Sequence, residues 1–131
     1  MINQYYWELA QRAAAIAVLP AEWIYSQWVH ETGNFTSELC THYNNLGGVT
    51  QEQPNDTPQP DGNCYYMQFV TPEAYANYFG WYLSRYAEDG IYGATSIAEY
   101  AASLKRGGYF GDTLENYIAG MTVAHIEAFG T

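Results

Sequence analysis

The residue best suited to catalysis in this sequence is Glu31, near the end of a segment rich in aromatic side chains. Gln27 and Trp28 precede it by four and three residues, so on a helix all three side chains share one face. Burial beside an indole ring and the negative C-terminal end of a helix both disfavour the charged carboxylate. Such a carboxyl group stays protonated near neutral pH and suits general acid catalysis on a glycosidic bond. The alternative is a solvated acid at a helix end.

The other residues that often bind metals or act as nucleophiles form no recognisable site. The three histidines, His30, His42 and His125, lack the close spacing of a metal motif, so we predict neither a metal site nor a cofactor. Cys40 and Cys64 are too few for a disulfide framework, and they form either one bridge or two ordinary thiols.

Helices must position Glu31, and the pattern of apolar and capping residues predicts five of them. The first covers 5–17, where alanine and leucine make an apolar stripe. The second begins at a proline and ends at a glycine, over 20–33, and contains Glu31. The third starts at the Thr-Pro-Glu run and continues over 71–87. The last two are predicted at 96–104 and at about 113–128.

The middle of the chain has a different character. Residues 50–63 contain three prolines and no large apolar side chain, which is typical of an exposed loop. The run 64–70 is the best strand candidate, and 46–50 is its expected partner. A two-stranded ribbon is marginal alone and must pack on helices. We therefore predict an α+β fold, mostly α, with one domain over 1–131 and a small inserted β ribbon.

The composition limits the possible partners. Aromatic residues make up 18% of the 131 residues, charged residues only 14%, and the net charge is −10. A chain this acidic lacks the basic surface that nucleic acids or anionic membranes require, and no apolar run is long enough to span a bilayer. Most of the aromatic residues are expected in the core, including a stripe of tyrosines at helical spacing: Tyr75, Tyr78, Tyr82 and Tyr86.

Several motifs occur in an order that resembles one known family. The segment 19–33 ends in Glu31-Thr32-Gly33, where the catalytic helix of the glucosaminidase-type peptidoglycan hydrolases ends in Glu-Ser-Gly. The run 43–49 is similar to the family's aromatic-Asn-Leu-Phe-Gly-Ile pattern, with Gly47 at the aromatic position. The Phe-bearing strand is matched by 67–69, and the late Ala-Gly-Tyr motif by 107–112. The resemblance covers about 20–121.

The resemblance implies a lysozyme-like fold and hydrolysis of the β-1,4 bond between N-acetylglucosamine and N-acetylmuramic acid. It makes Glu31 the general acid and Tyr109 the tyrosine that positions the sugar. Asn45 is expected to hold the turn after the catalytic helix or to touch substrate. We expect Trp28 beneath the acid, and Trp28, Tyr65 and Tyr66 among the substrate contacts.

The second acid of such a site is less well defined in this sequence. Pro58 stands close to the position of the family's helper carboxylate, and proline cannot do its work. Asp61 is the first candidate to replace it, with Asp56 and Glu52 as alternatives. Inverting chemistry tolerates well-separated carboxyl groups, and assistance by the substrate's N-acetyl group needs no second carboxylate.

Two further functions compete with a wall hydrolase. An inactive glycan-binding or structural virion module fits the changed motif and the charge, since cell-wall polymers are also anionic. An acidic inhibitor of a basic toxin fits the charge alone. The start of the chain lacks a standard signal peptide, as in a phage protein or a domain of a longer chain. We expect action at the bacterial wall, whether extracellular, periplasmic or virion-associated, by a monomer or a part of a larger assembly.

Overall fold

The computed structural model describes residues 1–52 and 65–131, which are mostly helical. The helical content fits the lysozyme-like class expected from the sequence. In chain order the helices of the described residues are α1 Gln4–Ala17, α2 Ala21–Thr32, α3 Glu38–Tyr43, α4 Pro72–Tyr82, the 3-10 helices η1 Leu83–Asp89 and η2 Ile91–Gly93, α5 Ile97–Arg106 and α6 Leu114–Phe129.

The helix ends lie close to where capping residues predicted them. The side chains of Thr71, Ser96 and Thr113 each accept a hydrogen bond from the backbone N–H three residues later. Gly33 ends α2 in the left-handed conformation, with φ at 59°. All five predicted helices are therefore present, although the one predicted to reach residue 87 becomes a 3-10 helix after Tyr82.

The predicted β ribbon is not formed in the described residues. A single antiparallel bridge joins Thr50 and Tyr66. Beyond that bridge, two amide side chains bond to backbone carbonyls that a neighbouring strand would otherwise bind. Asn45 donates to Met67 O and Asn44 donates to Phe69 O, both at 2.9 Å. The sequence analysis also missed α3, whose six residues carry too few apolar positions to show helical periodicity.

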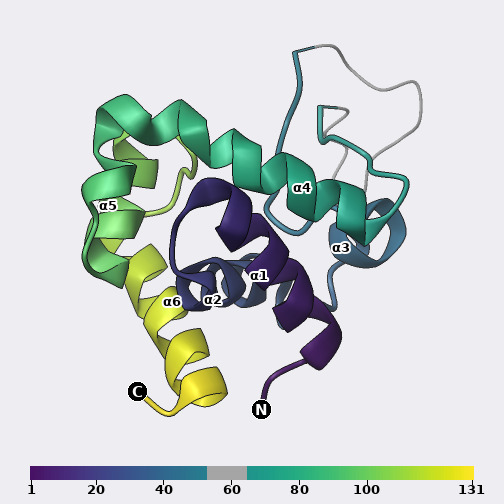
Figure 1. The fold of residues 1–131 in the computed structure, drawn as a ribbon, viewed down its shortest axis with the longest axis horizontal. Helices are drawn as coiled ribbons and strands as arrows, with labels where there is room; N and C mark the ends of the chain where they lie inside the picture. The colour runs from purple at the N-terminus through teal and green to yellow at the C-terminus, as the bar shows by residue number, and fades with distance from the viewer. Residues whose placement is uncertain (53–64) are drawn as a thin grey trace.

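Packing of helices places α2 at the centre of the molecule. Helix α1 packs on α4 and α2, and α2 packs on α6, which in turn contacts α5 (Figure 1). Gly80 allows the close approach of α1 and α4, since a methyl group there would lie 2.7 Å from Ala13 O. The chain ends also meet, through a hydrogen bond of 3.0 Å from the Met1 ammonium to Glu127 O.

Much of the aromatic excess is used in the core, as predicted. Of the tyrosine stripe, Tyr75, Tyr82 and Tyr86 are buried, and Tyr78 is partly buried. The rings pack edge-to-face or offset on their neighbours, which is the arrangement that their quadrupoles favour. Among the described residues, no helix has the length and apolar character needed to cross a bilayer.

The sequence left open whether Cys40 is a free thiol or half of a disulfide bridge. Its thiol is free and buried, with Sγ 3.8 Å from the Tyr6 hydroxyl oxygen. The other partner of the predicted bridge, Cys64, lies outside the described residues.

Candidate active site

Glu31 stands in the last turn of α2, immediately before a sharp change of chain direction. Gly33, Asn34 and Phe35 all have positive φ, between 59° and 66°. Two hydrogen bonds of 2.7 Å stabilise this turn, because the Thr32 hydroxyl donates to Trp28 O and accepts from Phe35 N. Phe35 is thereby packed against Tyr6 and Tyr25 in the core. The hydroxyl at position 32 therefore fixes the end of the helix that carries Glu31.

The carboxyl group of Glu31 lies in a largely desolvated environment. Burial raises the pKa of Glu31 from 4.5 to about 7, and the facing Tyr117 hydroxyl lowers it in part. No hydrogen bond of ordinary geometry joins the two groups. A carboxyl group with this pKa is substantially protonated at neutral pH, as general acid catalysis requires.

A glycine turn lies against the Glu31 carboxyl group. A methyl group at Gly48, where φ is 66°, would come within 3.9 Å of Glu31 Oε2 and 3.8 Å of Tyr66 Cε1. The Asn45 side chain holds this turn, since its amide donates to Val49 O at 2.9 Å and its oxygen accepts from Val49 N at 3.1 Å. Asn45 is 1% exposed, so of its two predicted roles the structural one matches its position.

Tyr109 reaches the same turn from the segment between α5 and α6. Its hydroxyl donates to Gly47 O at 2.6 Å, and its ring packs on Tyr82 and Tyr86. Glycine is required at position 47, because a methyl group there would lie 2.5 Å from the Tyr109 hydroxyl. Glycine at position 47 therefore allows the close contact with Tyr109.

Two aromatic residues predicted to bind substrate lie on the bridged segment. Tyr66 is partly buried and faces Gly48, on the side of Glu31, and Tyr65 is 46% exposed. Trp28 differs from both, because its ring is fully buried against Tyr75 and Phe79. Trp28 therefore supports α2 beneath Glu31 and presents no surface to solvent.

Four buried polar atoms of the described residues have no hydrogen-bond partner: Gln27 Nε2, Trp28 Nε1, Tyr75 OH and Tyr117 OH. Burial raises the pKa values of four tyrosine hydroxyls, and the Glu31 charge adds to the shift in each: Tyr75, Tyr100, Tyr109 and Tyr117. The sequence analysis predicted only a packing role for Tyr75. Helical spacing shows which face of the helix a ring occupies, but it does not show which groups lie near its hydroxyl.

The second carboxylate is not among the described neighbours of Glu31. Asp61 and Asp56, two of the three candidates, lie outside the described residues. The third, Glu52, is exposed and lines a hollow of about 420 Å³ with Tyr78, Trp81 and Arg85. This hollow lies beside the bridged segment, and Trp81 is 57% exposed in it. The sequence analysis did not single out Trp81.

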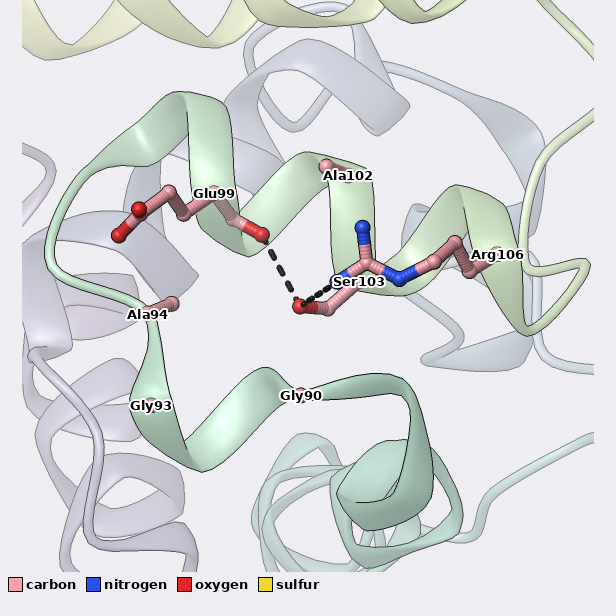
Figure 2. Close-up of a pocket in the computed structure, with 7 residues that line it drawn as sticks. All are labelled: Gly90, Gly93, Ala94, Glu99, Ala102, Ser103 and Arg106. Atoms are coloured by element: carbon pink, nitrogen blue, oxygen red, sulfur yellow. Dashed lines mark hydrogen bonds between the residues drawn. The ribbon is translucent and has the colours of Figure 1, made fainter.

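A separate hollow of about 230 Å³ lies on α5 and does not involve Glu31 (Figure 2). Its polar residues bond within the protein: Arg106 donates to Asp89 O and to the Ser103 hydroxyl, and Glu99 accepts from Thr95. These bonds join α5 to the chain around η1 and η2, so the hollow is a structural junction. No group of His, Cys, Asp and Glu suited to a metal ion occurs in the part of the chain that the structure describes.

Comparison with known proteins gives one result. The family model described as mannosyl-glycoprotein endo-beta-N-acetylglucosaminidase matches residues 7–128, which is nearly the whole chain. Neither the curated proteins nor the solved structures gave a match. The matched range includes Glu31, the glycine turn and Tyr109.

Proposed function

The chain belongs to the glucosaminidase family, and we propose that it cleaves the β-1,4 bond between N-acetylglucosamine and N-acetylmuramic acid in peptidoglycan. Family membership supports a glycoside hydrolase of the peptidoglycan type. The observation that carries the finer proposal is the buried Glu31 carboxyl group, with its pKa raised to about 7, beside a turn shared with Tyr66 and Tyr109.

In the proposed reaction, Glu31 is the general acid. Its carboxyl proton passes to the glycosidic oxygen as the bond between that oxygen and the anomeric carbon breaks. Positive charge then develops on the sugar, and the new Glu31 carboxylate faces it. Water completes the hydrolysis by giving its oxygen to the anomeric carbon and its proton to a base. Tyr109, held on Gly47 O, positions the sugar beside this acid.

Two different groups are compatible with the site as the partner of Glu31 in the reaction. A loop acid, Asp61 or Asp56, is the first candidate for activating the water. The substrate's own N-acetyl oxygen is the second, and it needs no further carboxylate from the protein. Glu52 is less suited, because it lines the hollow beside Trp81.

The surface around the site offers aromatic contacts for a glycan strand. Tyr65 and Trp81 are both about half exposed, and Arg85 adds a positive charge beside Trp81. Aromatic faces stack on sugar rings while neighbouring polar groups bond to hydroxyls. We propose that the protein acts at the bacterial cell wall, and that its partner is the peptidoglycan glycan strand.

The test is digestion of purified peptidoglycan by the wild type, by Glu31→Gln, and by Glu8→Gln as a matched control on an exposed glutamate of α1. Products are reduced and the new reducing sugar is identified by mass spectrometry. N-acetylglucosamine at the new end supports the proposal, with activity lost only in Glu31→Gln. N-acetylmuramic acid indicates a muramidase, and an anhydro product a lytic transglycosylase. Full activity of Glu31→Gln contradicts the role of Glu31.

A second candidate is a glycan-binding or structural module without activity. Two observations favour it: no carboxylate of the described residues accompanies Glu31, and the net charge is −10. Sedimentation of the protein with peptidoglycan, without any release of reducing ends between pH 4 and 8 and across salt concentrations, would support this module over the hydrolase.

A further inference from the structure

The hollow beside the bridged segment, which we call the Trp81 hollow, combines exposed aromatic surface with charged side chains. Its volume is about 420 Å³, and its lining includes Met67, Tyr78, Trp81, Arg85 and Glu52. The Tyr78 and Trp81 rings contact each other, with centroids 5.6 Å apart, and yet Trp81 is 57% exposed. Binding sites for small molecules have this size, an aromatic lining and a few polar groups that fix the orientation of the ligand.

Arg85 is one of four basic residues in a chain with a net charge of −10. Two of the others are used within the protein, because Lys105 donates to three backbone carbonyls and Arg106 donates to a backbone carbonyl and a hydroxyl. In the part of the chain that the structure describes, Arg85 instead lies over the Tyr82 ring, with Cζ 4.8 Å from the ring centroid. A guanidinium group stacked in this way keeps its N–H groups available for a carboxylate.

The polar groups of the Trp81 hollow define the chemistry of a ligand. A guanidinium group only donates hydrogen bonds, so Arg85 suits a carboxylate. The carboxylate of Glu52, which is exposed, only accepts them and suits the N–H groups of amides. The exposed indole of Trp81 provides an apolar face for a sugar ring. A ligand that carries a sugar ring, amide N–H groups and a carboxylate therefore matches all three residues.

The bridged segment connects the Trp81 hollow with the Glu31 site. Thr50 lines the hollow and pairs with Tyr66. The Tyr66 ring in turn faces Gly48, the glycine that lies against the Glu31 carboxyl group. Gly48 and Thr50 are two residues apart, which is a chain length of at most about 7 Å. A glycan bound at Glu31 is therefore close enough to place a neighbouring unit, or its substituent, in the hollow.

We propose that the Trp81 hollow binds a muramoyl unit of peptidoglycan, with Trp81 stacked on the sugar and Arg85 paired with a carboxylate of the attached peptide. This inference rests on the proposed function, because it extends the glycan site at Glu31 to the peptide part of the substrate. A polymer of N-acetylglucosamine without peptides lacks this carboxylate, so Arg85 selects peptidoglycan over it. Arg85 also gives an acidic protein a local attraction for an anionic polymer.

The experiment compares the binding of muramyl dipeptide with that of its neutral amide, in which a carboxamide replaces the carboxylate. Each ligand contains a single sugar, so neither is cleaved and binding is measured without turnover. The NMR signal of the Met67 methyl group, assigned with Met67→Leu, reports occupancy of the hollow, and the buried Met121 is the internal reference. We expect the wild type to bind muramyl dipeptide about 5- to 20-fold more tightly than the amide.

Three variants assign the preference to residues. Arg85→Gln should bind muramyl dipeptide no more tightly than the amide, because it lacks the charged donors. Arg12→Gln removes an exposed arginine of α1 as the matched control, and it should keep the preference of the wild type. Trp81→Ala should weaken both ligands severalfold and by a similar factor, because stacking does not depend on the carboxylate.

Several results would overturn the proposal: equal affinity of the wild type for the two ligands, the same loss of preference in Arg12→Gln, unchanged affinities in Trp81→Ala, or a Met67 signal that moves with neither ligand. Tighter binding of inorganic phosphate than of muramyl dipeptide would also overturn it. If muramyl dipeptide binds as expected but peptidoglycan is not cleaved, the hollow is confirmed and the proposed hydrolysis fails. If peptidoglycan is cleaved but the preference is absent, only the role of the hollow fails.

Discussion

The raised pKa of Glu31 lowers the unfolding free energy of the protein at neutral and alkaline pH. Between pH 4.5 and about 7, the folded protein holds a proton on Glu31 that the unfolded chain has released. The cost is therefore absent below pH 4.5, grows as the pH rises, and is complete above pH 7. The full shift corresponds to about 3 kcal/mol of unfolding free energy, as an upper value.

Replacement by an uncharged isostere removes this cost. Glu31→Gln is expected to equal the wild type at pH 4 and to be more stable at pH 8, by about 2–3 kcal/mol. Urea denaturation at both pH values, followed by circular dichroism, measures the difference. The matched variant Glu8→Gln changes an exposed glutamate on α1 and should show no such gain. If Glu31→Gln has the same effect at both pH values, or is less stable at pH 8, Glu31 is not the desolvated acid described above.

Three further predictions concern the surroundings of Glu31. Asn45→Ala should lower the unfolding free energy by about 2–4 kcal/mol in urea denaturation, because it removes the bonds that hold the glycine turn. Gly120→Ala should lower the melting temperature despite its better helix propensity, since the methyl group would strike the His30 ring; Gly93→Ala, in open space, is the control. Trp81→Ala should raise KM on peptidoglycan severalfold with kcat unchanged, whereas a drop in kcat alone would contradict a role in binding.

The sequence determined most of the helices and singled out Glu31 as the candidate acid. Caps such as Thr71, Ser96 and Thr113 act within one turn, so their signals are local and were read correctly. The position of Glu31 on one face with Gln27 and Trp28 follows from helical spacing alone. The family resemblance rested on ordered motifs over 20–121, and the family model matches 7–128. These features depend on neighbours in the chain.

The tertiary structure decided what surrounds the acid. Tyr75, Tyr100 and Tyr117 belong to three different helices. Side-chain contacts of α4 and α5 with α2, and the packing of α6 on α2, bring these tyrosines within the influence of the Glu31 charge. In the described residues a single bridge stands in place of the predicted ribbon, and the Asn45 side chain bonds to Met67 O across more than twenty residues. Burial and long-range hydrogen bonds are properties of the folded whole, and they turn a glutamate with a pKa of 4.5 into one with a pKa of about 7.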